Sequence, residues 1–192
     1  MTSMTAAAVI DFWFGPRAEK LWFAKNDALD AKIRERFGRL TVEAAAGRLS
    51  NWETTAADAL ALVVLLDQFP RNIHRGAPAA FAADALARAV AGRAIDRGFD
   101  LAIPRPRRFF FYLPFAHSED AADQDRSVAL FRTWVESAPP ERRADAEDQY
   151  GDILRHREII HRFGRFPHRN AVLGRVTTPA EAAFLEETRS SF

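Results

Sequence analysis

Two arginines, a histidine and an asparagine stand among phenylalanines, a glycine and a proline in the segment FGRFPHRN at 163–170. A guanidinium group binds phosphate or carboxylate through two parallel hydrogen bonds, and a glycine lets backbone amides come close to a ligand. The surrounding stretch 155–175 holds six arginines against one acidic residue, Glu158. These residue types predict an anion site in which Arg165 and Arg169 hold the anion.

A structural role is the alternative for the same two arginines. Arg165 and Arg169 could pair with Asp67 and Glu119 and so lock neighbouring loops together. Removing one partner of a buried pair costs about 3–5 kcal/mol, because the other charge is left buried without compensation. The sequence alone leaves both interpretations open.

A long apolar run precedes the first of these acidic residues. Residues 59–66, ALALVVLL, are apolar on every side of a helix, so we expect this helix at the centre of the fold. Asp67 then lies in its last turn, at the edge of the core. We expect the helix to run from about Thr55 to Phe69, where Pro70 breaks it.

The segment FFFYLPFAHSED at 109–120 follows the same pattern. Its aromatic run must be buried, and the polar residues His117 and Glu119 follow directly after it. Helical periodicity also turns Gln124 toward the inward face of the next helix. A buried amide or imidazole needs hydrogen-bond partners, since an unsatisfied polar group costs about 1–3 kcal/mol.

A histidine occupies the apolar face of a later helix. At 100° per residue, Ile153 and Ile160 share one face, and His156 falls near its centre. A partly buried imidazole beside a carboxylate is held in one tautomer and can act as a general base near neutral pH. His156 and His117 are therefore candidate acid–base residues, and a hydrogen-bonded core histidine is the structural alternative for each.

A metal site is a weaker interpretation of the same groups. His117, Glu119, His156 and Asp67 include residue types that commonly bind zinc. The spacings HxxxH and HExxH are absent, and the chain contains no cysteine. We therefore expect neither a metal nor another cofactor.

Glycines and prolines divide the chain into helical segments, and no alternating strand pattern extends beyond a few residues. A capping box, Thr178 with Glu181, predicts the start of a last helix at Pro179. Besides the segments named above, we expect helices before Gly15 and at 26–46, 78–98, 118–137 and 140–163. Seven or eight helices joined by short loops predict an all-α fold of stacked antiparallel pairs, in a single domain over 1–192.

The net charge and the hydrophobic pattern of the chain argue against two classes of binding partner, nucleic acid and membrane. The chain of 192 residues has a formal net charge of +1, which argues against binding nucleic acid over its whole surface. The run at 59–66 is far shorter than the roughly 20 residues that a membrane span needs. The first residues lack the positive charge and cleavage site of a signal peptide. We expect a soluble cytoplasmic protein that binds neither nucleic acid nor membrane.

Six motifs resemble, in order and spacing, a bacterial family known as domain of unknown function 924. They read VIDFWFG, WFAKND, LLDQFPRNIHRG, FYLPFAHSED, HREIIHRFGRFPHRN and LGRVTTPAEAAFL, and together they extend over residues 9–185. The resemblance implies an all-α fold of the tetratricopeptide-like superhelical type. The repeat signature of tetratricopeptide proteins is absent, so their peptide-binding role does not carry over with the fold.

The resemblance also marks a set of polar positions. Those that match the family's pattern are Asp67, Gln68, Arg71, Asn72, His117, Glu119, Gln124, His156, Arg165, His168, Arg169 and Asn170. The candidate ligand-binding positions among them are Arg71, Asn72, Gln124, Arg165, His168, Arg169 and Asn170.

These observations lead to two functional hypotheses. In the first, the protein binds a small anionic metabolite, bearing phosphate or carboxylate, where the segments DQFPRN, HSED and FGRFPHRN converge. The expected roles are anion binding by Arg71, Arg165 and Arg169, acid–base chemistry of a hydrolytic step by His117 or His156, and orientation by Asp67 and Glu119. In the second, the protein is a tetratricopeptide-like protein–protein interaction module, and the polar motifs are structural locks.

Overall fold

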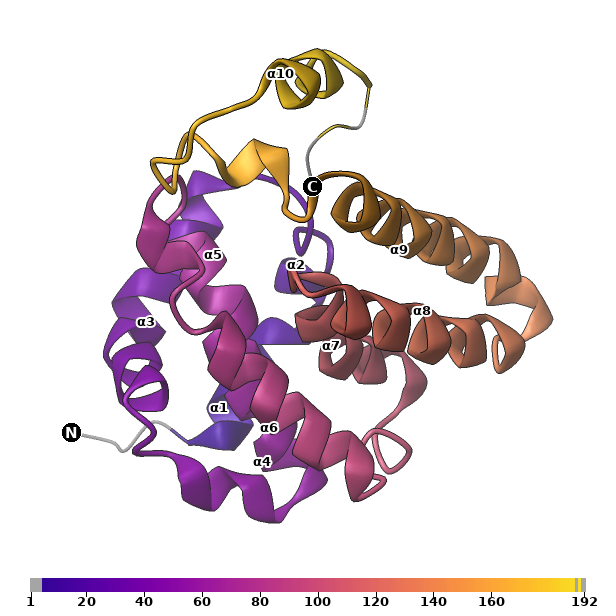
Figure 1. Ribbon diagram of the computed structural model, residues 1–192. Coiled ribbons are helices and arrows are strands. Elements are labelled where there is room, and N and C mark those ends of the chain that lie inside the picture. The colour runs from indigo at the N-terminus through magenta and orange to yellow at the C-terminus, as the bar shows by residue number, and fades with distance from the viewer. Residues whose placement is uncertain (1–4, 189, 191–192) are drawn as a thin grey trace. The chain divides into compact units, whose positions relative to one another are not determined.

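The computed structural model describes residues 5–188 and 190, which form helices and connecting loops with no strand among them (Figure 1). The expected all-α fold is therefore confirmed. The chain divides into two compact units, Met1–Pro114 and Phe115–Phe192, and each is described by itself. That the whole chain behaves as one domain stays a prediction.

The first unit is built from helices that surround one apolar element. They are α1 (Ala6–Trp13), α2 (Pro16–Glu19), α3 (Asp27–Ala45), α4 (Ala56–Val63), α5 (Phe69–Ile73), α6 (Asp84–Asp96) and all but the end of α7 (Arg105–Ala116), with short 3-10 turns η1 (Ser50–Thr54) and η3 (Pro78–Ala80). Helix α4 packs against α1 and α6, while α3 packs against α5. The side chain of Asn26 caps α3 by accepting a hydrogen bond from the Leu29 amide, as its position predicts.

The central helix continues beyond the proline that was expected to break it. Helix α4 passes through a π-helical segment, η2 (Val64–Gln68), into α5, and every residue from 59 to 70 is buried. The expected break at Pro70 is wrong, because Pro70 lies in the first turn of α5. In the wider π turn the Phe69 amide bonds to the Val64 carbonyl, and this local rearrangement accommodates a residue that lacks an amide hydrogen.

Aromatic rings form the core of this unit. The Phe69 ring lies 5.1 Å from Phe37 and 5.5 Å from Trp13, and Trp13 lies 5.8 Å from Phe110. All four side chains are fully buried. The motifs around these residues therefore anchor α1, α3, η2–α5 and α7 to one another.

The second unit contains a helical hairpin and a C-terminal helix. Its elements are α8 (Ala121–Glu136), η4 (Pro140–Arg142), α9 (Arg143–Phe163), η5 (Pro167–Arg169) and α10 (Pro179–Leu185). Helices α8 and α9 pack side by side in opposite directions (Figure 1). Buried Ile159, Ile160, Phe166 and Phe184 form a core cluster, and the capping box of Thr178 and Glu181 is present as predicted.

Two helices begin later than the sequence suggested. The helix expected from Pro78 begins at Asp84, because Pro78 starts a separate 3-10 turn. The helix expected from Ser118 begins at Ala121, where the side chain of Asp120 caps the first free amides.

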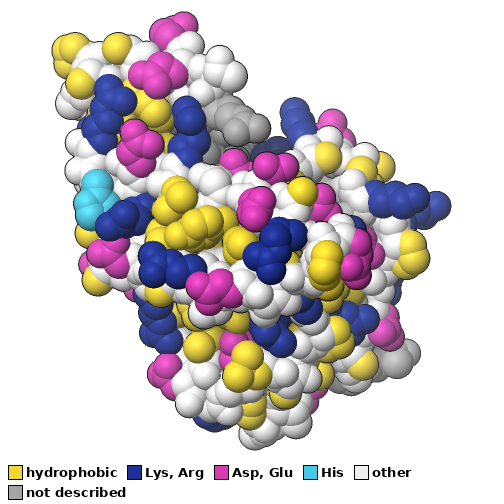
Figure 2. Space-filling view, turned by 90° about the vertical axis from the view of Figure 1, so that its right-hand side faces the viewer, with side chains coloured by type: hydrophobic (Ala, Val, Ile, Leu, Met, Phe, Trp, Pro, Cys, Tyr) yellow, Lys and Arg dark blue, Asp and Glu magenta, His cyan; other side chains and the backbone are white. Residues whose placement is uncertain are grey.

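The surface mixes charges of both signs. On the face that Figure 2 shows, Lys and Arg side chains are interspersed with Asp and Glu, and hydrophobic side chains lie between them. This pattern agrees with the formal net charge of +1. Among the described residues, no helix is long and apolar enough to cross a lipid bilayer.

Two glycines, Gly151 within α9 and Gly164 directly after it, test how this helix ends. Gly164 follows the helix with φ 69°, and a Cβ atom added at Gly164 or at Gly151 would meet no neighbour within 4 Å. We expect Gly164→Ala to lower the free energy of unfolding by about 1 kcal/mol, because L-residues disfavour the left-handed region. Gly151→Ala, inside the same helix, should raise it by about 0.5–1 kcal/mol. Urea denaturation measures both changes in the free energy of unfolding. If the two substitutions changed it in the same direction, the assigned end of α9 would be wrong.

Candidate functional site

One buried phenyl ring in the second unit is surrounded by polar side chains. The Phe166 ring centroid lies 5.5 Å from the ring of His156 and 5.6 Å from the ring of His168. The guanidinium carbon of Arg169 lies 4.5 Å from the same centroid. Phe166 is fully buried, while His156 and Arg169 are 9% and 7% exposed. We call these four residues the Phe166 cluster, together with His117, whose charge acts on both imidazoles.

The local sequence explains why these groups meet. Gly164 takes the left-handed conformation, and its amide donates to the Ile160 carbonyl, so α9 ends there. Pro167 then starts the short turn η5, which carries His168 and Arg169. Gly164 thus serves the helix end, and the approach of a ligand to its backbone stays a prediction.

Two histidines of the cluster, His156 and His168, are held neutral at physiological pH. Burial, with the charges of His117, His168 and Arg169 adding to it, lowers the pKa of His156 to about 3, while the hydrogen bond to the Asp152 carbonyl opposes this shift. Burial likewise lowers the pKa of His168 to about 4, with Arg169 and His117 adding to the effect and Glu119 opposing it. A protonated imidazole is disfavoured here because it would be poorly solvated and close to other positive groups.

Hydrogen bonding indicates the tautomer of His156. Its Nδ1 lies 2.7 Å from the backbone carbonyl oxygen of Asp152, one turn earlier on α9. A carbonyl oxygen can only accept, so Nδ1 carries the proton and Nε2 has the lone pair. The sequence suggested a carboxylate next to this imidazole, but the atom bonded to Nδ1 is a backbone carbonyl.

Gln124 holds the loop that carries His117. Its Nε2 donates to the carbonyl oxygens on either side of His117, at 2.8 Å for Ala116 and 2.7 Å for Ser118. Gln124 is fully buried, as its helical position predicted, and its Oε1 has no hydrogen-bond partner among the described residues. The contacts make Gln124 a positioning residue for His117.

Glu119 joins two of the segments that the sequence singled out. Its carboxylate accepts a hydrogen bond of 2.9 Å from the Phe166 amide and two bonds, of 2.9 and 2.8 Å, from the Arg175 guanidinium. Burial opposes the charge, but the bonds from Arg175 and Phe166 hold the pKa of Glu119 below its ordinary value. The segments HSED and FGRFPHRN therefore meet, as predicted.

Arg165 has a different partner from the one suggested by the sequence. Its guanidinium donates two bonds, of 2.6 and 2.8 Å, to the Glu181 carboxylate and one, of 2.8 Å, to the Val176 carbonyl. These bonds, together with the amide of Thr178, lower the pKa of Glu181 to about 2. Asn170, fully buried, also donates to Glu181. Arg165 and Asn170 thus secure the start of α10.

The segment DQFPRN lies in the first unit, where its arginine is paired. The Arg71 guanidinium donates two bonds, of 2.9 and 3.0 Å, to Asp84 and lies 3.2 Å from the carboxylate of fully buried Asp67. Burial works against its charge, but Asp67 and Asp84 outweigh burial and raise the pKa of Arg71. Sequence reasoning did not identify Asp84 as a partner of Arg71. The only local pattern that marks Asp84 is that of an acidic residue in the first turn of a helix, α6.

Asn72 belongs to a second buried network of the first unit. It donates a bond of 2.7 Å to Asp30, which also accepts two bonds, of 2.8 and 3.0 Å, from Arg75. Burial raises the pKa of Asp30, but the bonds from Arg75 and Asn72 outweigh it and lower the pKa overall. This network ties α5 and the loop after it to α3.

The predicted site residues therefore fall into two groups. Arg71, Arg165, Asn72 and Asn170 hold parts of the fold together, while the Phe166 cluster gathers imidazoles and a guanidinium around one ring. Convergence of the segment DQFPRN with the other two stays a prediction. Over residues 5–188 and 190, no group of three or more His, Cys, Asp or Glu side chains has the arrangement of a metal site.

Comparisons with known proteins place the chain among relatives of unknown function. Residues 9–189 match the family described as bacterial protein of unknown function (DUF924). A solved structure of a protein of unknown function from Agrobacterium tumefaciens is 44% identical and has a TM-score of 0.80, over 94% of this chain and 96% of that one. No curated protein matches the chain.

The buried carboxylate of Asp30 offers a test of the first network. We expect Asp30→Ala to lower the free energy of unfolding by about 2–3 kcal/mol, because it leaves the buried Asn72 amide without its acceptor. Asp27→Ala removes an exposed carboxylate from the first turn of the same helix and should cost less than about 1 kcal/mol. Equal losses in urea denaturation would show that Asp30 contributes only to the helix dipole.

The low pKa of His156 makes stability depend on pH. Between pH 6.5 and about 3, the unfolded chain binds a proton at this residue and the folded chain does not, so stability falls as the pH is lowered. One such histidine contributes a slope of up to about 1.4 kcal/mol per pH unit. We expect His156→Gln to flatten the dependence of unfolding free energy on pH in this window.

The matched control for this measurement is His161→Gln, which alters an exposed histidine of the same helix. Its pH dependence should follow that of the wild type. An unchanged slope in His156→Gln would mean that His156 is already protonated in the folded protein near pH 6.

Proposed function

Because the chain belongs to the bacterial family of unknown function DUF924, its role has to be derived from its own residues, and we propose that it binds a small anionic metabolite at the Phe166 cluster. The observation that carries this proposal is the convergence of His156, His168 and Arg169 on one buried ring. Arg169 keeps its charge at any physiological pH. A buried guanidinium beside imidazole groups favours a phosphate or carboxylate as its ligand.

Electrostatics favour an anion over a cation at this place. The pKa values of His156 and His168 are lowered by the positive groups of the cluster as well as by burial. A cation would add to this repulsion, whereas an anion would relieve it and would let an imidazole donate a charged hydrogen bond. The ligand class is therefore a small phosphate- or carboxylate-bearing molecule.

Hydrolysis of the bound metabolite is the chemistry that the proposal assigns to the imidazoles. His117 would act as the acid–base residue, because the two carbonyls that flank it are held by Gln124. His156, with a pKa of about 3, is a weak base and would serve as a hydrogen-bond acceptor through Nε2. Glu119 would orient the site through its bond to the Phe166 amide.

A protein-interaction module is the second candidate function, and the internal ion pairs favour it. Arg71 and Arg165 each make two hydrogen bonds to one carboxylate, of Asp84 and Glu181 respectively. Under this hypothesis, such pairs would serve as the structural locks. Under it, Arg169 would also be a lock, and its loss would destabilise the protein without affecting any small ligand.

Ligand binding can be tested by thermal shift with phosphate monoesters, nucleotides and dicarboxylates. A ligand at 100 times its Kd adds about 2.7 kcal/mol, which raises the melting temperature by several degrees at this chain length. We expect Arg169→Gln to abolish the shift that the best ligand produces. Arg157→Gln removes a partly exposed arginine of α9 that pairs with Asp125, and this control should keep the shift.

Two results would contradict the proposal. One is that no anion of the panel shifts the wild-type melting temperature. The other is that Arg169→Gln keeps the full shift. Urea denaturation without ligand separates the two candidate functions, since a lock at Arg169 predicts a large loss of stability for Arg169→Gln in the absence of any ligand.

A further inference from the structure

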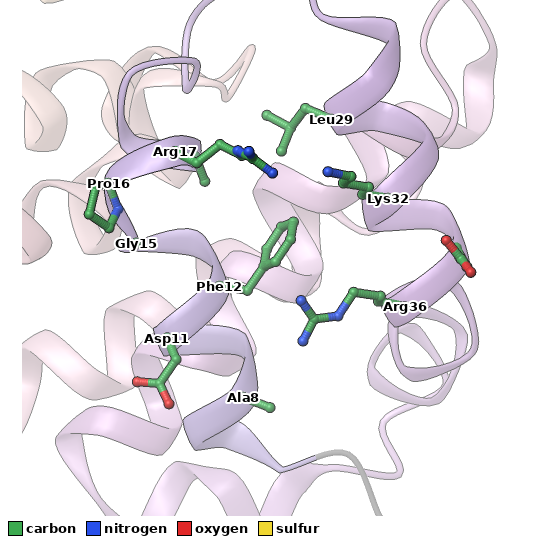
Figure 3. Close-up of a pocket in the computed structure, with 11 residues that line it drawn as sticks. Ala8, Asp11, Phe12, Gly15, Pro16, Arg17, Leu29, Lys32 and Arg36 are labelled. Atoms are coloured by element: carbon green, nitrogen blue, oxygen red, sulfur yellow. The ribbon is translucent and has the colours of Figure 1, made fainter.

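A cavity of about 780 Å³ lies in the first unit between α1, α2 and α3, and its lining includes none of the residues of the Phe166 cluster (Figure 3). Its size falls within the roughly 300–1,000 Å³ of pockets that bind small molecules. The lining that matters for binding comprises Ala8, Phe12, Arg17, Leu29, Lys32 and Arg36.

Three cationic side chains point into this cavity. Arg17 extends from α2 and Lys32 from α3, so that their charged ends face one another across the opening, and Arg36 enters from the next turn of α3 (Figure 3). Within the described chain, Arg17 and Lys32 form no hydrogen bond or ion pair. The Arg36 guanidinium lies 5.0 Å from the ring of Phe12 and 5.1 Å from that of Phe37.

Within the described chain, the acidic side chains of the lining form no ion pair with these cations. Asp11 points away from the cavity (Figure 3), and neither Asp11 nor Glu35 forms an ion pair with another described residue. Like charges that face one space repel each other, and an anion between them removes the repulsion. The cavity is therefore electrostatically suited to an anion with more than one negative charge.

The floor of the cavity is apolar. The half-buried ring of Phe12 stands between the cationic groups, and Leu29 is buried beside it (Figure 3). The tight turn at Gly15 leads into Arg17, and a Cβ atom at Gly15 would lie 2.8 Å from the Asp11 carbonyl oxygen, so the backbone of this turn would have to shift. An aromatic or aliphatic group could pack on Phe12 while its charged end reaches the three cations.

From this arrangement we infer that the cavity binds a phosphate monoester with an aromatic or otherwise apolar organic part. A phosphate dianion offers three oxygens to Arg17, Lys32 and Arg36, while a single carboxylate would satisfy fewer of them. The inference goes beyond the proposed function, because it uses a different unit of the chain and none of the Phe166 cluster.

Calorimetric titration of the full-length protein with phenyl phosphate tests this site. We expect saturable binding that weakens with added salt, and at least about tenfold weaker binding for the double variant Arg17→Gln/Lys32→Gln. Both side chains are exposed, so the variant should fold normally. The matched control, Lys20→Gln/Arg39→Gln, removes one exposed lysine and one exposed arginine that do not line the cavity, and it should bind like the wild type.

Further titrations distinguish this site from the Phe166 cluster and from non-specific apolar binding. Arg169→Gln should retain the part of phenyl phosphate binding that Arg17→Gln/Lys32→Gln loses, because Arg169 does not line the cavity. Benzoate should bind more weakly than phenyl phosphate, and benzyl alcohol should not compete. Absence of binding to the wild type, equal binding of benzyl alcohol, or equal losses in the two double variants would each overturn the inference.

Discussion

The carboxylate of Glu119 is the group on which the candidate site depends. It receives the Phe166 amide and the Arg175 guanidinium, and it thereby fixes the loop after α7 to the loop after α9. Phe166 is the ring around which two imidazoles and a guanidinium gather, so its position sets theirs. The geometry of the whole cluster thus follows from one charge that must be compensated because it is partly buried.

Local patterns predicted much of the fold. The cap at Asn26, the capping box of Thr178 and Glu181, and the end of α9 at Gly164 are all decided by residues within a few positions of one another. The burial of Gln124 and His156 follows from helical periodicity alone. The continuation of the central helix through Pro70 did not follow, because it depends on a π turn whose stability comes from tertiary packing.

Pairing of charges is where sequence reasoning failed. The sequence identified Arg71, Arg165 and Glu119 as polar groups near the core, but it suggested Asp67 and Glu119 as partners for Arg165. The actual partner, Glu181, lies 16 positions further along the chain, and its only local signal was a helix cap. A guanidinium accepts any carboxylate that the fold brings close, so the pairing depends on the path of the loops and not on residue type.

The two proposed anion sites would attract an anion through different electrostatic interactions. At the Phe166 cluster the imidazoles of His156 and His168 are neutral, so a bound anion would raise their pKa values and draw in a proton, and binding there would be coupled to pH. In the cavity of the first unit the cations are exposed to solvent, so the attraction for an anion is screened by salt. A buried site with neutral donors favours discrimination between ligands, because an unpaired polar group inside it is costly. An open basic cavity instead favours the electrostatic attraction of anions from solution.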